Sequence, residues 1–265
     1  MAKYWYYFKS IFELLFGFKN WLTVMKVFMN VDLIGPFTVQ LKKTSISMRV
    51  RGKMDIWSIK ETFIDRFYTK YGCDIEDGWT VIDIGAAIGE FSIFTAFGHP
   101  KTHVIAYEPF IESVELLREN LLLNNLENVK VIPKAVWNKT GRINLDLSHK
   151  EPLKITSTPG SKNEADNRRI SVEAVSLKDV LSSNHLKNID LIKLDCEGAE
   201  FDILLDSDRD TVRAFRRIVM EYHDSQSDRH HSQLVSHLEK LGYRVTTRRN
   251  VVHPEIGYLF AEQLR

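Results

Sequence analysis

From residue 80 onward, hydrophobic and polar positions switch regularly between a strand pattern and a helix pattern. Short apolar runs that end in polar residues predict strands at 80–84, 103–107, 129–136, 141–147, 170–175, 189–195, 216–223, 243–248 and 256–262. Apolar residues with helical spacing predict helices at about 89–97, 111–125, 176–181, 198–206 and 232–242. Strands that alternate with helices predict an α/β fold, with a mostly parallel sheet covered by helices on both faces.

The first 30 residues have helical spacing and many aromatic side chains. Their apolar stripe consists of Tyr7, Ile11, Leu14, Phe18, Leu22, Met25 and Met29. Lys9, Glu13 and Asn20 fall roughly opposite this stripe, and the charges argue against both a signal peptide and a membrane span. The stripe predicts a helix packed on its own domain or on a second subunit through residues 4–29. The alternative is an interfacial membrane helix flanked by lysines.

These patterns divide the chain into three parts. Residues 1–31 form the amphipathic helix, residues 32–79 form a mixed cap segment, and residues 80–265 form the main α/β domain. Within that domain, residues 148–169 are polar and rich in turn formers. A stretch of this length in a compact domain predicts a lid, a binding loop or a disordered segment.

Composition narrows the class of protein. The 265 residues carry a formal net charge of +1, which disfavours nucleic acid as a partner because nucleic-acid enzymes usually carry excess basic charge. The two cysteines, Cys73 and Cys196, provide neither a disulfide framework nor a cysteine-rich zinc site. They favour a reducing compartment, so we expect a cytoplasmic protein, with peripheral membrane contact if the first helix is interfacial.

The stretch "VIDIGAAIGEF", residues 81–91, is typical of a nucleotide-binding turn between a strand and a helix. Asp83 lies within the apolar run of Val81, Ile82 and Ile84, and Gly85 and Gly89 flank the turn. Ala87 stands where a dinucleotide fingerprint has its middle glycine, which disfavours an NAD-type oxidoreductase. Glu90, in the first turn of the helix, would repel a pyrophosphate, so the turn suits a cationic or neutral ligand. A tight turn without a ligand remains the alternative.

Acidic residues follow other strands of the predicted sheet, where ligands of such sheets bind. Glu108 ends the second strand and suits a ribose with two free hydroxyls. In "KLDCEGAE", Asp195 and Glu197 share one side of the chain and could orient a hydroxyl, accept its proton or face a sulfonium. Lys193 is a candidate for the same site, or it pairs with one of these acids. Glu200 falls on the following helix, and we expect it to be solvated.

Histidines supply the remaining candidates. His223 ends the strand "RRIVMEYH" beside the same site and is a candidate general base, with a purely structural histidine as the alternative. His230 and His231 begin a helix, and we expect both to be exposed. No H-E-x-x-H or similar spacing occurs, so the sequence predicts no metal.

Taken together, these residues resemble the FkbM family of S-adenosylmethionine-dependent methyltransferases. The resemblance rests on "VIDIGAAIGEFS", "VIAYEPFIESVELLRENLLLNNLENVKVIPKAV", "IDLIKLDCEGAEFDIL" and "IVMEYH", in order over residues 80–225. It implies a class I methyltransferase fold: a Rossmann-like three-layer sandwich whose seven-stranded sheet has an antiparallel last strand. It also implies methyl transfer to a hydroxyl of a sugar, glycan or natural product. The alternatives are an inactive scaffold of the same fold and an NAD-type oxidoreductase.

The resemblance also implies roles for individual residues. The cofactor S-adenosylmethionine would be bound by Asp83, Gly85, Ala86, Gly89, Glu108, Pro109, Ala135 and Asp195. Among these, Glu108 would hold the ribose, and residues 134–136 would border the adenine. The catalytic candidates are Lys193, Asp195, Glu197 and His223. The family commonly has asparagine where this sequence has Ala87, and this difference puts one polar contact in doubt.

Overall fold

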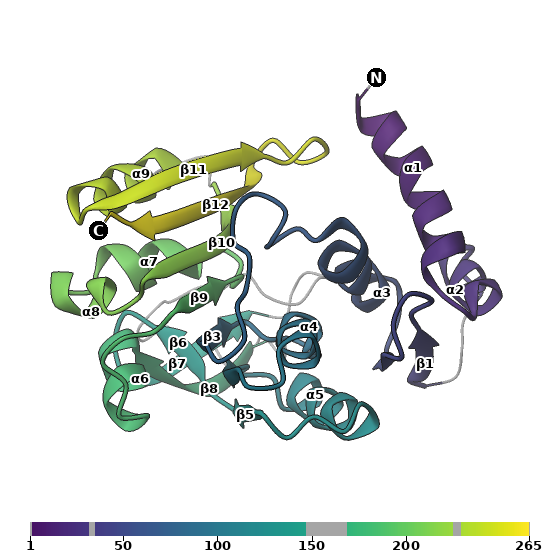
Figure 1. Cartoon of the computed structure of the whole chain (residues 1–265), viewed down its shortest axis with the longest axis horizontal. Helices are drawn as coiled ribbons and strands as arrows, with labels where there is room; N and C mark the ends of the chain where they lie inside the picture. The colour runs from purple at the N-terminus through teal and green to yellow at the C-terminus, as the bar shows by residue number, and fades with distance from the viewer. Residues whose placement is uncertain (1, 32–34, 147–168, 225–228, 265) are drawn as a thin grey trace.

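The computed structural model describes residues 2–31, 35–146, 169–224 and 229–264. Its centre is a seven-stranded sheet with the strand order β11-β12-β10-β9-β3-β4-β5 (Figure 1). The strands are β3 (Thr80–Ile84), β4 (His103–Tyr107), β5 (Val129–Ile132), β9 (Leu191–Leu194), β10 (Arg217–His223), β11 (Tyr243–Arg249) and β12 (Ile256–Gln263). The five strands from β10 to β5 are parallel, whereas β12 runs antiparallel to both β10 and β11. The predicted sheet, with its antiparallel last strand, is confirmed.

Helices cover both faces of this sheet because its strands are apolar on both sides. Ile82, Ile105 and Ile192 face a core that includes residues of α6, α7 and α9, while Val81 and Val104 face the side of α4. The helices of the main domain are α4 (Glu90–Gly98), α5 (Ile111–Leu123), α6 (Leu177–Ser183), α7 (Ala199–Leu205), α8 (Arg209–Arg213) and α9 (His231–Lys240). The three-layer arrangement places the carboxyl ends of β3, β4, β9 and β10 at one edge, where the candidate residues lie.

The predicted strand at 129–136 is two strands, β5 and β6 (Ala135–Trp137), divided at Pro133. Proline has no amide hydrogen to donate to a strand ladder, which accounts for the interruption. Strand β6 joins β7 (Gly141–Asp146) and β8 (Arg169–Ser176) in a separate three-stranded sheet of order β6-β8-β7. The predicted loop at 148–169 lies outside the described residues, apart from its last residue.

The predicted single helix at 1–31 is wrong, because it divides into α1 (Ala2–Gly17) and α2 (Trp21–Phe28). The break comes from contacts distant in sequence. Phe18 forms a bridge with Leu41, and the Asn20 side chain donates to the Thr38 carbonyl over 2.8 Å. The rest of the cap segment contains β1 (Phe37–Gln40), β2 (Ser47–Val50), α3 (Lys53–Ile59) and the π-helix η1 (Lys60–Asp65).

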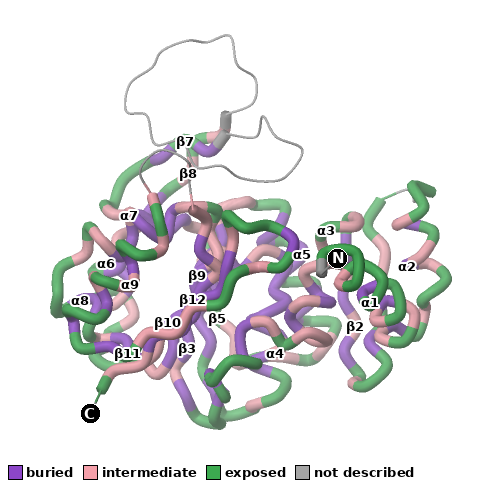
Figure 2. The backbone as a smooth tube through the Cα atoms, turned by 90° about the horizontal axis from the view of Figure 1, so that it is seen from above, coloured by how far each residue is buried: buried purple, intermediate pink, exposed green. Residues whose placement is uncertain are grey.

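Helix α1 packs through a different face from the predicted stripe. Leu14 is buried as expected, but Tyr7 and Ile11 are exposed. Glu13, placed opposite the stripe by the sequence, instead faces the protein and pairs with the buried Lys60 over 3.0 Å. Both views place α1 at the edge of the molecule, and Figure 2 shows its turns mostly exposed. None of the helices in the described part of the chain is long and apolar enough to cross a membrane.

Candidate active site

The turn after β3 lies directly against the end of β9. Gly85 has a positive φ of 72°, and its amide donates to the Tyr107 carbonyl over 3.0 Å. A Cβ atom at this position would lie 1.9 Å from the backbone oxygen of Asp195. Gly89 is similarly restricted, because a Cβ there would lie 2.9 Å from Leu117. Both glycines are therefore required by backbone geometry and close packing.

Ala87 connects this turn to the end of β4. It adopts the left-handed conformation with φ of 46°, which asparagine tolerates better than alanine. The Ala87 amide donates to Glu108 Oε2 and the Phe110 amide donates to Oε1, both over 2.9 Å. Burial raises the pKa of Glu108 to about 7, even though both amides favour the charged form.

Lys193 forms two ion pairs, a shorter one with Asp83 and a longer one with Asp195, one of the acids that follow it in the chain. Lys193 and Asp83 are register partners on the parallel strands β3 and β9, and both side chains are almost fully buried. Lys193 Nζ lies 3.1 Å from Asp83 Oδ1 and 4.0 Å from Asp195 Oδ2. It also donates to the Gly85 carbonyl over 2.8 Å. The lysine thus holds the turn after β3 and the end of β9 in one arrangement.

Asp195 is oriented by Tyr68, a residue of the cap segment. The Tyr68 hydroxyl donates to Asp195 Oδ2 over 2.6 Å. Burial raises the pKa of Tyr68 well above its usual value, so the phenol keeps its proton and acts as a donor. The sequence pattern indicates no role for Tyr68, because only the fold brings residues 68 and 195 together.

His223 lies between two carboxylates at the end of β10. Its Nε2 is 3.6 Å from Glu197 Oε2, and its Nδ1 is 3.4 Å from Glu200 Oε1. Burial alone lowers the pKa of His223, but Glu200 and Glu197 outweigh burial and raise it to about 10. An imidazolium has no free nitrogen lone pair to accept a proton, so this geometry disfavours His223 as a general base at neutral pH.

The expectation that Glu200 is solvated is wrong, because its side chain is fully buried. Its two oxygens accept hydrogen bonds from the amides of Cys196 and Gly198, over 2.8 and 2.9 Å. These amides face inward because Glu197 and Gly198 have positive φ values of 54° and 99°. Glu200 therefore holds the strained loop that presents Glu197.

Two further acids, Glu61 and Glu221, surround Asp195. Glu61 Oε1 accepts a hydrogen bond from Trp57 Nε1 over 2.9 Å. Burial is the main cause that raises the pKa of Glu61, to about 7, and the nearby charge of Asp195 acts in the same direction. Burial and Asp195 also raise the pKa of Glu221 well above its usual value. Burial and neighbouring charges thus shift both carboxyl groups toward their protonated forms.

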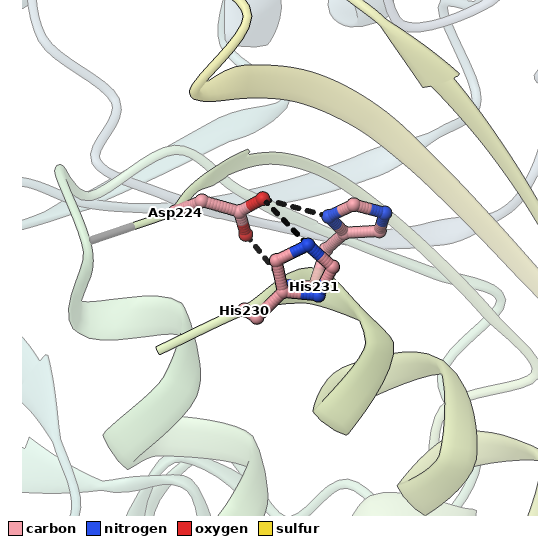
Figure 3. A group of neighbouring side chains, drawn as sticks. All are labelled: Asp224, His230 and His231. Atoms are coloured by element: carbon pink, nitrogen blue, oxygen red, sulfur yellow. Dashed lines mark hydrogen bonds and ion pairs between the residues drawn. The ribbon is translucent and has the colours of Figure 1, made fainter. Parts of the chain in front are cut away.

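The second histidine group lies further along, at the start of α9 (Figure 3). Asp224 accepts a hydrogen bond from the His231 amide over 2.6 Å, and its Oδ2 lies 2.7 Å from His231 Nδ1 and 3.7 Å from His230 Nε2. His230 is exposed as expected, whereas His231 is partly buried and stacks on Tyr222. Asp224 with the two histidines has ligand-type atoms within 4.8 Å of one another, as does the trio Asp195, Glu197 and His223. The prediction that the protein binds no metal stays a prediction.

The buried acidic side chains of the site fit a cationic cofactor better than a pyrophosphate. Glu90 is buried in the first turn of α4, and its Oε2 has no hydrogen-bond partner among the described residues. Burial raises the pKa of Glu90 to about 7, while the nearby Lys193 and a hydrogen bond from Ser58 lower it. An ammonium or sulfonium group would satisfy this carboxylate, whereas an anion would be repelled.

The remaining predicted cofactor residues lie around the same edge. Ala86 is buried in the turn after β3, and its amide donates to the Tyr107 carbonyl over 3.1 Å. Pro109 follows Glu108 and is half-buried. Ala135 is buried in β6, beyond the end of β5. The fold thus places all the predicted cofactor residues at or after the ends of β3, β4, β5 and β9.

Comparison with known proteins gives one consistent result. A family model described as "Methyltransferase FkbM domain" matches residues 83–245. Methyltransferase sdnD of Sordaria araneosa is 29% identical over 214 residues, which cover 71% of this chain and 81% of that protein. The 31-O-demethyl-FK506 methyltransferase FkbM of Streptomyces tacrolimicus is 26% identical over 191 residues, covering 62% of this chain and 73% of that protein.

A solved structure supports the fold. The crystal structure of Methyltransferase FkbM from Methylobacillus flagellatus KT superposes with a TM-score of 0.51 at 16% identity. The superposition covers 74% of this chain and 46% of that one, so this chain spans about half the length of that structure.

Proposed function

The chain belongs to the FkbM methyltransferase family, and from this premise we propose that it methylates a hydroxyl group of a sugar, glycan or natural-product acceptor. The family makes it an S-adenosylmethionine-dependent methyltransferase, which removes the NAD-type oxidoreductase alternative. The observation that carries the proposal is the oriented Asp195 carboxylate, held by Tyr68 at the end of β9. The name of one relative, a 31-O-demethyl-FK506 methyltransferase, also supports transfer to oxygen.

In this proposal the residues after β3 and β4 bind the cofactor. Glu108 accepts hydrogen bonds from the two ribose hydroxyls, and Glu90 faces the positive charge of the methionine part. Gly85 and Gly89 allow the turn to approach closely. When bound, S-adenosylmethionine would supply a methyl group on a positively charged sulfur. This sulfur is a good leaving group when an acceptor oxygen is held in line behind the methyl carbon.

Asp195 and its neighbours handle the acceptor and its proton. Asp195 accepts the proton of the acceptor hydroxyl, because the neighbouring His223 already holds its own proton at neutral pH. Glu61 and Glu221, when protonated, can each donate one hydrogen bond and accept others, which suits the several hydroxyls of a sugar. These two acids beside Asp195 make this side of the site fit a polyhydroxylated acceptor.

Transfer to a hydroxyl predicts a specific product. The protein is incubated with S-adenosylmethionine labelled on its methyl group and with glycan and small-metabolite extracts from cells that lack the gene. We expect a labelled product that gains one methyl group and behaves as an ether, surviving mild alkali that cleaves methyl esters. Mass spectrometry with fragmentation checks this. A product methylated on nitrogen, carbon or a carboxyl group would overturn the hydroxyl assignment, and no cofactor binding would favour an inactive scaffold.

Glu108→Gln is expected to weaken binding of S-adenosylmethionine by about tenfold to a hundredfold, the range for a lost charged hydrogen-bond acceptor. In the parent protein the affinity should rise between about pH 6 and pH 8, because the pKa of Glu108 is about 7 and the ionised carboxylate accepts the ribose hydrogen bonds more strongly than its protonated form. Isothermal titration calorimetry across this range measures both effects.

The pKa of Glu90 is also raised to about 7, so both acids contribute to the pH dependence of cofactor affinity in the parent. The difference in this pH dependence between the parent and Glu108→Gln gives the contribution of Glu108. The affinity of Glu108→Gln should therefore depend less steeply on pH. Glu112→Gln, an exposed acid in the first turn of α5, is the matched control and should bind like the parent. Equal affinity of Glu108→Gln and parent at pH 8 would contradict the ribose role.

A further inference from the structure

An exposed aromatic face covers the outer side of α1. It consists of Tyr4, Trp5, Phe8, Ile11, Phe12 and Phe16, all more than 40% exposed. Three ring pairs run along it: Trp5 with Phe8, Phe8 with Phe12, and Phe12 with Phe16, with centroids 4.9 to 6.4 Å apart. Eleven of the nineteen large hydrophobic side chains that are exposed in the described residues lie between residues 4 and 31. Such a concentration marks an interaction surface rather than ordinary scatter.

Charge around this aromatic face is strongly biased. Seven of the 36 basic and two of the 35 acidic side chains lie in residues 1–50, so this segment carries +5 and the rest of the chain −4. By helical geometry, the face spans about 140° of the circumference of α1. Lys9, which pairs with Glu13 over 2.7 Å, falls next to one margin, and Lys3 falls further from the other. Lys42 lies over the Phe16 ring, 5.6 Å from its centroid.

From these observations we propose that the aromatic face of α1 docks on the surface of an anionic membrane. Tryptophan and tyrosine favour the level of the lipid headgroups, while phenylalanine and isoleucine can enter the acyl boundary. The surrounding lysines are attracted to anionic lipids. A symmetric dimer through the same face is disfavoured, because a two-fold contact would bring the lysines of both copies together.

The side of α1 opposite its aromatic face packs against the acceptor side of the site. Lys60 is fully buried and bridges α1 to η1, with Nζ 3.0 Å from Glu13 and 2.6 Å from Asp65. The Tyr6 hydroxyl reaches Glu61 Oε1 over 3.5 Å, and Glu61 is one of the acids near Asp195. If the function proposed above holds, docking would place methyl transfer at the membrane surface, with α1 between the lipid and the acceptor side of the site.

Vesicle flotation tests the docking itself, independently of methyl transfer. We expect the full chain to float with vesicles that contain phosphatidylglycerol, and to float much less with pure phosphatidylcholine. Trp5→Ser/Phe8→Ser should lower the fraction bound to anionic vesicles about tenfold or more, since it removes two interfacial aromatic anchors. Lys3→Glu/Lys42→Glu, which reverses the charge of two of the lysines around the face, should lower it as well, and added salt should weaken parent binding.

The matched control is Leu122→Ser/Val251→Ser, which removes two equally exposed apolar side chains elsewhere and should float like the parent. Circular dichroism confirms that each variant folds. Light scattering without lipid should give the same mass for the parent and for Trp5→Ser/Phe8→Ser. A parent that does not float, equal flotation of the aromatic variant, or a parent dimer that this variant dissociates would each overturn the proposal.

Discussion

Asp195→Asn is expected to lower the turnover number by about 10²- to 10⁴-fold, the range that a positioned general base contributes. Asparagine keeps the size of the side chain, and its oxygen can still accept the Tyr68 hydrogen bond that Asp195 Oδ2 accepts over 2.6 Å. It cannot take the proton of the acceptor hydroxyl. Because Glu108 and the glycine turn remain intact, binding of S-adenosylmethionine should change little. Methyl-transfer kinetics at saturating cofactor, with calorimetry of cofactor binding, separate the two effects.

Glu197→Gln is the matched control for this variant. Glu197 follows Asp195 by two residues and its side chain is 46% exposed, against 28% for Asp195. If Glu197 only orients the acceptor, its variant should lose less than about tenfold in turnover. Tyr68→Phe should fall between the two variants, since it keeps the base but removes the group that orients it. Parent-like turnover of Asp195→Asn would remove Asp195 from the mechanism, and a larger loss in Glu197→Gln would transfer the role of base to Glu197.

The sheet could be predicted from the sequence because its strands are continuous apolar runs with polar ends. Glu108 and Asp195 each follow such a run, and Asp83 lies one residue before the end of another, so the strand pattern alone was enough to place them at one edge of the sheet. Their partners could not be predicted in the same way. The sequence suggested that Lys193 pairs with a following acid, and it does lie 4.0 Å from Asp195. Its closer partner is Asp83, 110 positions earlier, because β3 and β9 are neighbours.

Predictions from helical spacing were wrong where left-handed backbone conformation or contacts distant in sequence determine burial and helix ends. Glu200 occupies a helical position that would normally be solvated, but the left-handed residues Glu197 and Gly198 turn two amides toward it. The break between α1 and α2 depends on Asn20 bonding to β1, which helical spacing does not encode. Tyr68 reaches Asp195 only because the cap segment packs on the sheet.

Lys193→Met is expected to lower the free energy of unfolding by about 3–5 kcal/mol, the cost of leaving one partner of a buried ion pair uncompensated. The variant keeps an unbranched side chain of similar length but leaves the Asp83 carboxylate buried without its cation, and the Gly85 carbonyl without its donor. Urea unfolding of parent and variant measures the difference. Lys134→Met is the surface control: Lys134 pairs with Glu173 at an exposed position, and its loss should cost less than about 1 kcal/mol.

The double variant Asp83→Asn/Lys193→Met separates charge from geometry. If the uncompensated charge causes the loss, the double variant should recover much of the unfolding free energy, because replacing both charges of a buried pair costs far less than removing one. It should still bind S-adenosylmethionine more weakly than the parent, since nothing then holds the Gly85 carbonyl against the end of β9. Recovery of stability without recovery of binding would show that the pair shapes the cofactor turn. A double variant as unstable as Lys193→Met would contradict this account and point to lost packing of the lysine stem instead.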